Sequence, residues 1–598
     1  MPKKAVPKQA ASKKATSAKR STESAEVKKA SAKQATSRLS SLAELEALRK
    51  DILSKRDQNK PIIAVCGGTG CRAVGNREII SAFEAEIKKQ SLRTKVDIRE
   101  TGCPGLCEKG PIVVIYPEEI CYTQVIPEDA PEIVSQTIVG KKVIDRLVYT
   151  DPTTGAKSVH QSEIPFYKKQ VRLLTGDNGK IDPKSIEDYL AVGGYSALAK
   201  ALQTMTPEQV VAEVKKSNLK GRGGAFVAAS IKWEPMRLAR ADTKYLVCNC
   251  HEGDPGTFAD RRMMEANPHS ILEGMLIGAF AMGVNEGYIF VGDEFPLTVE
   301  NTETAIKQAE EYGLLGKNIL GSGLNFNVRI SIDAGDYVCG ETTALMASIE
   351  GRVGEPDKNY HHASDSGLWE KPTCINNLQT WANVPLIINR GADWYNTIGT
   401  QSTRGTRTFS LMGKVNNSGL VEVPLGMTLR EIVYDIGGGL PEGKKFKAVL
   451  VGGPMGGFAP ESLIDMPVDF EQISKVGMAL GSGLIIADED TCIVDMVKFY
   501  LTFLTNESCG KCTPCRDGFR QMLKIVTDIS EGNGKESDIA LLEAIAEVQG
   551  IASLCGLGQN GFKSTLSAIK YFRDELEAHI KDKRCPAGVC KILSAVGH

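Results

Sequence analysis

The sequence predicts a multidomain α/β protein that ends in a helical region. The 598 residues exceed what one hydrophobic core supports, which indicates several domains. Short apolar strands alternate with helical segments along much of the chain, a pattern typical of α/β domains. Apolar residues make up 42% and the formal net charge is −1, as in ordinary folded proteins. No apolar run reaches the length of about eighteen residues that a transmembrane helix needs, so no membrane span is expected.

Residues 1–58 are predicted to form a disordered basic tail and a lead helix. Lys, Ala and Ser dominate up to about residue 40, and such a segment buries too little surface to fold. We interpret it as a solvated tail; binding to nucleic acid, anionic lipid or an acidic partner is the alternative, and no nucleic acid is expected for the protein as a whole. The cations are mainly Lys rather than Arg and no apolar stretch opens the chain, which argues against a transit peptide and a secretory signal. A short amphipathic helix is expected over 41–53.

Residues 59–150 are predicted to form a small α/β domain. A strand, a Gly-rich loop, a helix and two further strands follow one another over 61–71, 77–90, 95–101 and 111–117. A linker rich in Pro, Gly and charged residues, 150–185, separates this unit from a second and larger α/β domain.

The larger α/β domain is assigned to residues 165–405. Its expected strands and helices alternate, with strands at 244–250, 286–294 and 327–333 and helices at 268–283 and 299–314. Residues 406–485 are rich in β-type stretches separated by Asn- and Gly-containing turns. Residues 486–582 are expected to be helical with Cys-rich loops, and 583–598 form a Cys-containing C-terminal tail.

Sixteen cysteines without an export signal indicate metal or redox chemistry in a reducing compartment, and we expect a cytoplasmic location. Two pairs stand in Gly-rich loops of the first α/β domain: Cys66, Cys71, Cys103 and Cys107. Four thiolates of this kind can enclose a 2Fe–2S cluster. Buried free thiols and a zinc ion are the alternatives; Gly beside the cysteines and their position at strand ends favour the cluster.

A second group is more specific. Cys509, Cys512 and Cys515 form C-x2-C-x2-C, and Cys555 follows about forty residues later. Three thiolates at that spacing bind one corner of a cubane and a distant fourth completes a 4Fe–4S site.

A third group lies close to the C-terminus. His579, Cys585 and Cys590, with Cys492 as a fourth partner, suit tetrahedral zinc, and loose thiols are the alternative. The other cysteines follow no ligand spacing and are expected to pack in cores: Cys121, Cys248, Cys250, Cys339 and Cys374.

A Gly-rich loop, 221–224, precedes Lys232 in the larger α/β domain. Glycines let backbone N–H groups approach a phosphate, and the lysine adds a cation. Because any tight turn uses glycine, this loop alone is weak support for phosphate binding.

Five motifs occur in order: GRGG followed by IKW, EGDPGTFADR, DYVCGETTAL, KPTCINN, and ESCGKCTPCR with SLCGLG. Together they resemble the NADH-oxidising flavoprotein subunit of respiratory complex I. The N-terminal cysteine unit, EGDPG and the terminal CPAGVC make the chain more similar to the beta subunits of electron-bifurcating hydrogenases and related formate dehydrogenases. Subunits of this type attached to benzoyl-CoA reductase complexes also fit, and the resemblance covers about residues 60–592.

The resemblance implies a thioredoxin-like 2Fe–2S domain, a Rossmann-like domain for FMN and NADH, a soluble-ligand-binding β-grasp domain and a helical bundle with a 4Fe–4S cluster. It also implies that NADH passes a hydride to FMN, which releases single electrons to the clusters. A zinc site near the C-terminus is implied as well. The expected partners are other iron–sulfur subunits of an oxidoreductase complex: a small 2Fe–2S subunit and a catalytic subunit of the hydrogenase, formate dehydrogenase or benzoyl-CoA reductase type.

Most flavin positions of the family are matched. The residues that the resemblance assigns to cofactor binding are Gly221, Arg222, Gly223, Gly224, Lys232, Asn249, Glu252, Tyr337, Gly340, Glu341, Asn376, Asn377 and Thr380. Glu252 and Asp254 are the catalytic candidates, and Asp254 could face the nicotinamide. One position departs, because His251 stands where the family has an acid that would bond the ribityl chain.

The NADH positions depart further from the family. Within the Gly-rich loop, Phe226 replaces Gly, and Val227 and Pro235 stand where aromatic residues would sandwich the adenine. Thr342 replaces a Glu, and further along the chain Asp357 and Asn359 replace a basic pair and His362 an aromatic residue. Each lost stacking contact costs about 1–3 kcal/mol, and reversed charge beside a pyrophosphate adds repulsion.

Two interpretations follow. In the first, the chain is an electron-transfer subunit that keeps its clusters and FMN while NADH binding is weakened or lost; in the second, it is a fully active NADH:acceptor oxidoreductase subunit. No motif supports a hydrolase. Either interpretation makes the chain an iron–sulfur flavoprotein of the NADH dehydrogenase type.

Overall fold

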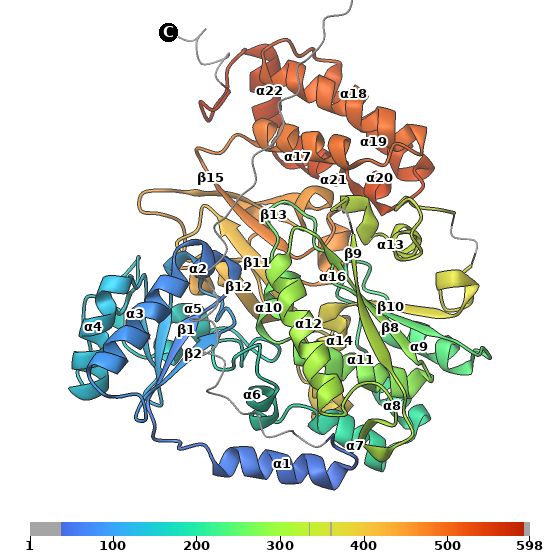
Figure 1. Cartoon of the computed structure of the whole chain (residues 1–598). Coiled ribbons are helices and arrows are strands. Elements are labelled where there is room, and N and C mark those ends of the chain that lie inside the picture. Colours follow the sequence, from blue (N-terminus) through green and yellow to red (C-terminus); the bar gives the residue numbers. More distant parts are fainter. Residues whose placement is uncertain (1–37, 334, 359–360, 591–598) are drawn as a thin grey trace, which may run out of the picture. The chain divides into compact units, whose positions relative to one another are not determined.

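The computed structural model describes residues 38–333, 335–358 and 361–590 (Figure 1). Residues 1–37, which include most of the predicted basic tail, therefore lie outside the described residues. Asn359 and the last eight residues of the predicted C-terminal tail also lie outside them. The predicted lead helix is confirmed as α1, Leu42–Ser54, whose N-terminus is capped by Ser41 accepting a hydrogen bond from the Glu44 N–H. No helix in the described part of the chain is long and apolar enough to cross a membrane.

The first α/β domain contains a four-stranded sheet in the order β2-β1-β3-β4. The central strand β1 pairs in parallel with β2 and antiparallel with β3. The strands are β1 Ile62–Cys66, β2 Asp97–Thr101, β3 Val113–Tyr116 and β4 Ile120–Tyr122. The helices are α2 Thr69–Ala73, α3 Asn76–Lys89, α4 Ala130–Glu132, the π-helix η4 Ile133–Val139 and the 3₁₀ turns η2 Cys107–Lys109 and η3 Pro127–Asp129. The expected strand–helix–strand order is confirmed, and β4 is an addition.

A connecting segment follows this domain. It contains the two-stranded sheet β5 Tyr149–Thr150 and β6 Lys157–Ser158, the turn η5 Gln161–Glu163, and the helices α5 Pro165–Lys168 and α6 Ile186–Ala191. The segment that the composition suggested as a linker therefore contains regular secondary structure.

The larger α/β domain is built on a four-stranded, fully parallel sheet in the order β10-β7-β8-β9. Its strands are β7 Tyr245–Asn249, β8 Glu286–Gly292, β9 Asn327–Asp333 and β10 Thr373–Asn377. Helices α11 and α14 contact β7, and α12 and α13 contact β9. Parallel strands place their carboxyl ends at one edge, which is where α/β sheets bind ligands.

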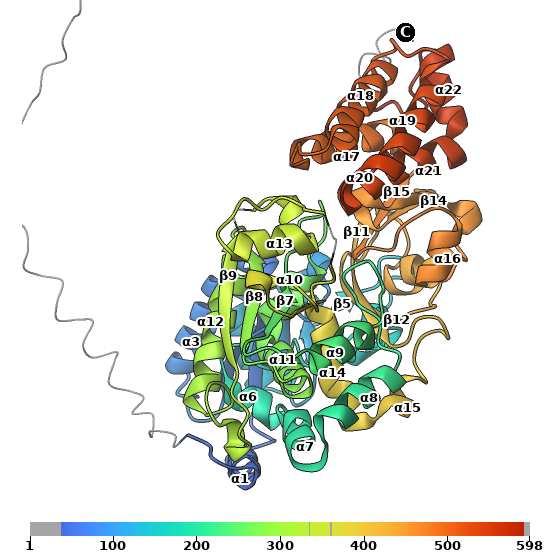
Figure 2. The ribbon, with the colours of Figure 1, turned by 90° about the vertical axis from the view of Figure 1, so that its right-hand side faces the viewer.

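The helices of this domain surround the sheet (Figures 1 and 2). They are α7 Ser196–Thr204, α8 Pro207–Lys216, α9 Ala229–Leu238, α10 Ala259–Ala266, α11 Pro268–Met282, α12 Pro296–Glu311, α13 Thr342–Ile349, α14 Leu378–Arg390 and α15 Ala392–Tyr395. The 3₁₀ turns are η6 Ile319–Gly321, η7 Tyr337–Gly340 and η8 Leu368–Glu370.

A five-stranded mixed sheet in the order β12-β11-β15-β13-β14 forms the third domain. Its elements are β11 Thr406–Gly413, β12 Gly419–Pro424, β13 Phe446–Val451, β14 Gly457–Pro460, β15 Gly483–Asp488, the π-helix η9 Glu431–Ile436, the turns η10 Gly453–Met455 and η11 Glu461–Leu463, and α16 Phe470–Lys475.

The C-terminal region is helical as predicted, and its helices pack side by side in both views (Figures 1 and 2). They are α17 Ile493–Glu507, α18 Thr513–Ser530, α19 Asp538–Ala552, α20 Gly556–Asn560, α21 Lys563–Tyr571 and α22 Arg573–Lys581. Helix α21 also contacts β14, so the helical region packs on the third domain.

A buried carboxylate fastens the connecting segment to the third domain. Glu422 on β12 is fully buried and accepts hydrogen bonds from the backbone N–H groups of Leu174 (3.0 Å) and Thr175 (2.9 Å). The hydroxyls of Thr175 and Thr406 donate to the same carboxylate at 2.9 and 2.6 Å. Burial raises the pKa of Glu422, and these donors oppose that effect.

Glu422→Ala is expected to lower the thermal midpoint of the full chain by about 5 °C or more. The substitution leaves several buried donors without an acceptor, at about 1–3 kcal/mol each, and one kcal/mol moves the midpoint by roughly 2–4 °C in a domain of this size. Differential scanning fluorimetry measures the shift. Glu461→Ala removes an exposed carboxylate from the same domain and serves as the control; equal midpoints for both variants would contradict this role of Glu422.

Candidate functional site

A cavity of about 590 Å³ opens at the carboxyl edge of the parallel sheet. It brings together many of the predicted site residues: Arg222, Gly223, Gly224, Asn249, Glu252, Asp254, Tyr337, Gly340, Glu341 and Asn377. Residues of the third domain and of the C-terminal helices complete its walls, among them Met478 and Lys563. The remaining predicted residues do not line the cavity: Gly221, Lys232, Asn376 and Thr380.

Three of these residues form hydrogen bonds that hold the Gly-rich loop and the neighbouring strand in place. Gly221 N–H donates to the Val227 carbonyl at 2.8 Å, and Lys232 Nζ donates to the Ile375 carbonyl at 2.8 Å. Thr380 Oγ1 accepts from the Arg222 N–H at 2.9 Å.

Arg222 itself is bound by the protein. Its guanidinium donates to the carbonyls of Thr406 (3.1 Å), Lys220 (2.7 Å) and Arg404 (2.5 Å) and to the Tyr395 hydroxyl (3.1 Å). Only 1% of the residue is exposed. The side chain therefore anchors the loop, and of the loop's residues Gly223 and Gly224 remain for a close approach to a ligand. Gly224 has φ +105°, a conformation that favours glycine.

Phe226 turns into the protein instead of toward solvent. It has φ +51°, is 4% exposed, and stacks on Phe470 with ring centroids 4.7 Å apart. The next residue, Val227, is 42% exposed. Phe226 thus packs against Phe470, which lines the cavity.

Arg407 is a cavity residue that the sequence did not single out. It is 2% exposed, its guanidinium carbon lies 5.1 Å from the centre of the Phe226 ring, and neither Nε nor Nη1 has a hydrogen-bond partner among the described residues. Burial, with the nearby charge of Arg222, lowers its pKa to about 10. The guanidinium therefore stays charged near neutral pH and adds a positive charge to the lining of the cavity. The only signal in the sequence was a single arginine within a β-type stretch, which the structure shows as β11.

Glu252 caps the first turn of α10. Its carboxylate accepts from the backbone N–H groups of Ala259 (2.8 Å), Asp260 (2.8 Å) and Arg261 (3.1 Å). Burial and the nearby carboxyl of Asp260 raise the pKa of Glu252 to about 8. Asp260, also absent from the predicted set, accepts from Gln379 Nε2 at 2.6 Å and from Asn377 Nδ2.

The second catalytic candidate, Asp254, lies in the cavity. Its carboxylate accepts from the Tyr337 hydroxyl at 2.6 Å, and burial raises its pKa to about 6. A titratable carboxyl and a phenol thus meet at the cavity wall, so a proton can be held or released there near neutral pH.

His251 is accommodated within the fold. Its Nε2 lies 3.3 Å from the carboxylate of Asp333 at the end of β9, and both side chains are almost fully buried. Its ring stacks on Phe290. His251 thus lies beside a buried carboxylate at the end of β9.

The first cysteine quartet converges in the first α/β domain. Cys66 ends β1, Cys71 lies in α2, Cys103 follows β2 and Cys107 begins η2. Cys103 Sγ and Cys107 Sγ are 3.7 Å apart, and hydrogen bonds from Cys107 and Cys66 lower the pKa of Cys103. The domain therefore has the donor set that a 2Fe–2S cluster needs.

The second quartet lines one small cavity at the ends of α18, α19 and α20. Cys509, Cys512, Cys515 and Cys555 all face it. Its wall also includes Val338 and Leu557, which, with Cys555, line the 590 Å³ cavity as well. The same three residues thus form a common wall between the two cavities.

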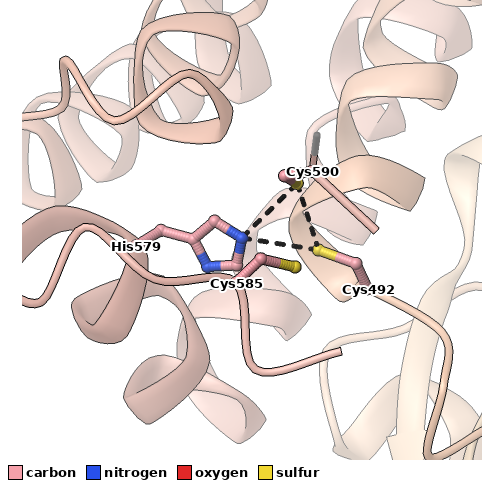
Figure 3. A group of neighbouring side chains, drawn as sticks. All are labelled: Cys492, His579, Cys585 and Cys590. Carbon is pink, nitrogen blue, oxygen red and sulfur yellow. Dashed lines mark hydrogen bonds between the residues drawn. The ribbon is translucent and has the colours of Figure 1, made fainter. Parts of the chain in front are cut away.

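A third group forms a compact centre in the C-terminal region (Figure 3). The ligand atoms of Cys492, His579, Cys585 and Cys590 all lie within 4.8 Å of one another and all four residues are buried. Cys492 Sγ is 3.6 Å and Cys590 Sγ 3.5 Å from His579 Nε2, and the two sulfurs are 3.8 Å apart. The fold therefore brings Cys492 to the three residues near the C-terminus with which the sequence grouped it.

The remaining cysteines are all buried, as predicted. Burial raises the pKa of Cys121, Cys339 and Cys374 to about 12. These thiols pack in the interior and are not activated for chemistry.

This fold and these sites define an iron–sulfur flavoprotein oxidoreductase subunit, and models of known families match its parts. They are the thioredoxin-like [2Fe-2S] ferredoxin at 51–137, the Nuo51 FMN-binding domain at 214–386, the SLBB domain at 408–459 and the NADH-ubiquinone oxidoreductase-F iron–sulfur binding region at 495–579. The predicted fold class is confirmed.

Sequence similarity to known proteins shows the family to which the chain belongs. The chain is 48% identical over 427 residues to the NADP-reducing hydrogenase subunit HndC of Solidesulfovibrio fructosivorans, covering 71% of this chain and 87% of the relative. It is 42% identical over 402 residues to an NADH-quinone oxidoreductase subunit of Escherichia coli strain K12, covering 67% and 90%. The chain belongs to the family of NADH-binding flavoprotein subunits that includes these proteins. It is an oxidoreductase subunit of the NADH dehydrogenase type.

A solved structure shows a similar fold. A chain of NAD+-reducing [NiFe]-hydrogenase in the H2-reduced state aligns with a TM-score of 0.62 at 22% identity, covering 90% of each chain.

The raised pKa of Glu252 predicts that the stability of the fold depends on pH. Its pKa is about 8 in the folded chain against an ordinary value of 4.5, so the folded state binds more protons between these values. Stability is therefore expected to fall as the pH rises from about 5 to about 8. Glu252→Gln should flatten this slope, as read from thermal midpoints across the range; the exposed Glu311→Gln is the control, and an unchanged slope in Glu252→Gln would rule the contribution out.

Proposed function

We propose that this chain binds FMN in the 590 Å³ cavity and passes electrons between it and the two iron–sulfur clusters. The observation that carries the proposal is the wall shared by the cavity and the second cysteine quartet: Val338, Cys555 and Leu557 line both. A ligand in the cavity and a cluster on the cysteines would be separated by single residues, which suits electron transfer.

The residues present fit FMN. The cavity volume is within the range of about 300–1,000 Å³ typical of cofactor sites. Gly223 and Gly224 allow a close approach of the backbone, and Arg407 adds a positive charge to the lining. Asn249 and Asn377 lie at the strand ends, and each keeps one amide hydrogen beyond its bond to Gly340 or Asp260. When bound, the flavin supplies the exchange between two-electron and one-electron chemistry.

Three positions that the family uses for the nucleotide favour weakened NADH binding. Val227 presents an exposed aliphatic side chain where an aromatic ring would stack on adenine. Pro235 likewise offers no aromatic ring for stacking and is exposed on α9. Asp357 adds an exposed carboxylate 3.9 Å from Lys511. These three positions therefore offer less stacking and more negative charge than a dinucleotide favours.

One observation favours the alternative, a fully active NADH:acceptor oxidoreductase subunit. Asp254 and Tyr337 remain hydrogen-bonded in the cavity, where they can orient a substrate and hold a proton. The names of the relatives, an NADP-reducing hydrogenase subunit and an NADH-quinone oxidoreductase subunit, agree with this alternative.

The two candidates are separated by adding NADH to the anaerobically purified full chain after its flavin and iron have been quantified. Weakened binding predicts little bleaching of the visible bands at micromolar NADH. Val227→Phe should improve the apparent affinity about tenfold, because one stacking contact is worth about 1–3 kcal/mol. Val192→Phe, at another exposed valine, is the control.

Full bleaching of the unmodified protein would establish the active dehydrogenase instead. A preparation that contains both clusters but no flavin would overturn the assignment of the cavity.

The same proposal places the chain in a larger oxidoreductase complex of a reducing, cytoplasmic compartment. Its partners would be other iron–sulfur subunits, namely a small 2Fe–2S subunit and a catalytic subunit of the hydrogenase, formate dehydrogenase or benzoyl-CoA reductase type. The named relatives are themselves subunits, which supports this assignment.

Zinc is the ion proposed for the C-terminal centre. Tetrahedral zinc with bonds of about 2.3 Å to sulfur and 2.0 Å to nitrogen separates its ligand atoms by about 3.5–3.8 Å. The separations among Cys492, His579 and Cys590 are 3.5, 3.6 and 3.8 Å. His579 Nδ1 also lies 2.7 Å from the Glu575 carbonyl, which fixes the ring as metal-bound histidines require.

Elemental analysis of the anaerobically purified chain should find about one zinc per chain. Cys585→Ser and Cys590→Ser should each lose most of it while the iron content is unchanged, because neither residue belongs to a cluster quartet. Cys121→Ser, a buried cysteine outside every group, is the control. Iron in place of zinc, or zinc retained in both variants, would contradict the assignment.

A further inference from the structure

Arg262 on α10 reaches from the flavin domain to the loop that connects Cys66 and Cys71. A Cβ atom added at Gly68 would lie 3.0 Å from Arg262 Nη1, and one added at Gly70 would lie 3.2 Å from Nη2. The guanidinium thus rests directly on the backbone of the cysteine loop. Glycine at these two positions leaves the room that the charged group occupies.

The guanidinium is buried together with one carboxylate. The side chains of Arg262 and Glu265 are only 7% and 3% exposed, and their closest N and O atoms are 3.0 Å apart. Glu265 Oε1 accepts from the Thr69 hydroxyl at 2.5 Å. The pair therefore fastens α10 to the cysteine loop from the side of the larger domain.

The ion pair does not use all of the guanidinium's hydrogen-bonding capacity. Arg262 Nε is buried and has no hydrogen-bond partner among the described residues. Although burial alone would lower the pKa of Arg262, the negative charges of Cys103 and Glu265 raise it. A permanently positive group thus lies close to thiolates on the other side of a domain boundary.

We propose that Arg262 and Glu265 set the reduction potential of the 2Fe–2S cluster, Arg262 raising it and Glu265 lowering it. The inference rests on the cluster assignment in the proposed function. Reduction adds one negative charge to a cluster held by four thiolates. A buried cation beside the cysteine loop stabilises that charge and a buried anion opposes it. Both are positioning residues and neither is a ligand.

The position of the pair on α10 connects the proposed tuning to the flavin site. The same helix begins at the cavity, where Glu252 caps it and Asp260 binds Asn377 and Gln379. One helix therefore has the flavin site at its first turn and the cluster loop beside its last. The charge balance of the pair then biases where an electron leaving the cavity settles.

The test is a redox titration of the full chain, followed by EPR of the reduced 2Fe–2S cluster under conditions that broaden the 4Fe–4S signal. Arg262→Gln should lower the potential by the equivalent of about tenfold in the reduction equilibrium, which is about 59 mV for a one-electron couple. Glu265→Gln should raise it by a similar amount. Arg262→Lys keeps the charge and should remain near the value of the unmodified protein.

Arg261→Gln is the matched control. It removes the same charge from the same helix, but its guanidinium lies over the Phe295 ring. Its charge is among the main influences on the pKa of Glu252, whereas Arg262 is the arginine that most affects Cys103 and Cys107. Its cluster potential should be unchanged.

Opposite shifts in Arg262→Gln and Glu265→Gln establish electrostatic tuning, because a purely structural loosening of the contact would move both in the same direction. Unchanged or parallel shifts overturn the proposal. If Arg262→Gln fails to assemble the cluster, the sign of the Glu265→Gln shift decides. Absence of a 2Fe–2S signal in the unmodified chain would instead refute the cluster assignment itself.

Discussion

The capping of α10 by Glu252 is the contact on which the arrangement of the redox sites depends. The buried side chain of Glu252 accepts hydrogen bonds from three backbone N–H groups that the start of a helix would otherwise leave without partners. Since α10 is short, the position of its first turn fixes that of its last. Asp260, Arg262 and Glu265 are therefore placed together by one interaction, and the strand-end residues and the cysteine loop are brought to a common element.

Local sequence pattern was enough to predict the closely spaced members of each cysteine group and most strands. Each cysteine group contains ligands spaced by two to four residues, and such spacing follows from the geometry of a single loop. The strand β10 was not predicted, because its Cys-Ile-Asn-Asn sequence shows no alternation and its burial comes from pairing with β7. Strand β4 is only Ile120–Tyr122 and also lacks a periodic signal.

The residues that sequence reasoning missed are those whose role depends on distant partners. Arg407 is one charged residue in a β-rich stretch, and only the fold brings it to the Phe226 ring. Arg222, in contrast, was expected at a cofactor, yet four protein oxygens take up its guanidinium. Motif position gives the neighbourhood of a side chain, whereas its hydrogen-bond partners are determined by packing across the whole domain.

The centre formed by Cys492, His579, Cys585 and Cys590 joins the beginning of the helical region to its end. Cys492 stands directly before α17 and lies 98 residues from Cys590 in the sequence. An ion bound there would act as a removable cross-link, because it ties the ends of almost the entire bundle. Closing a loop of about one hundred residues restricts the unfolded chain by the equivalent of about 4–5 kcal/mol in the chain-entropy description. The integrity of the bundle that houses the second cysteine quartet would then vary with the supply of that ion in the cell.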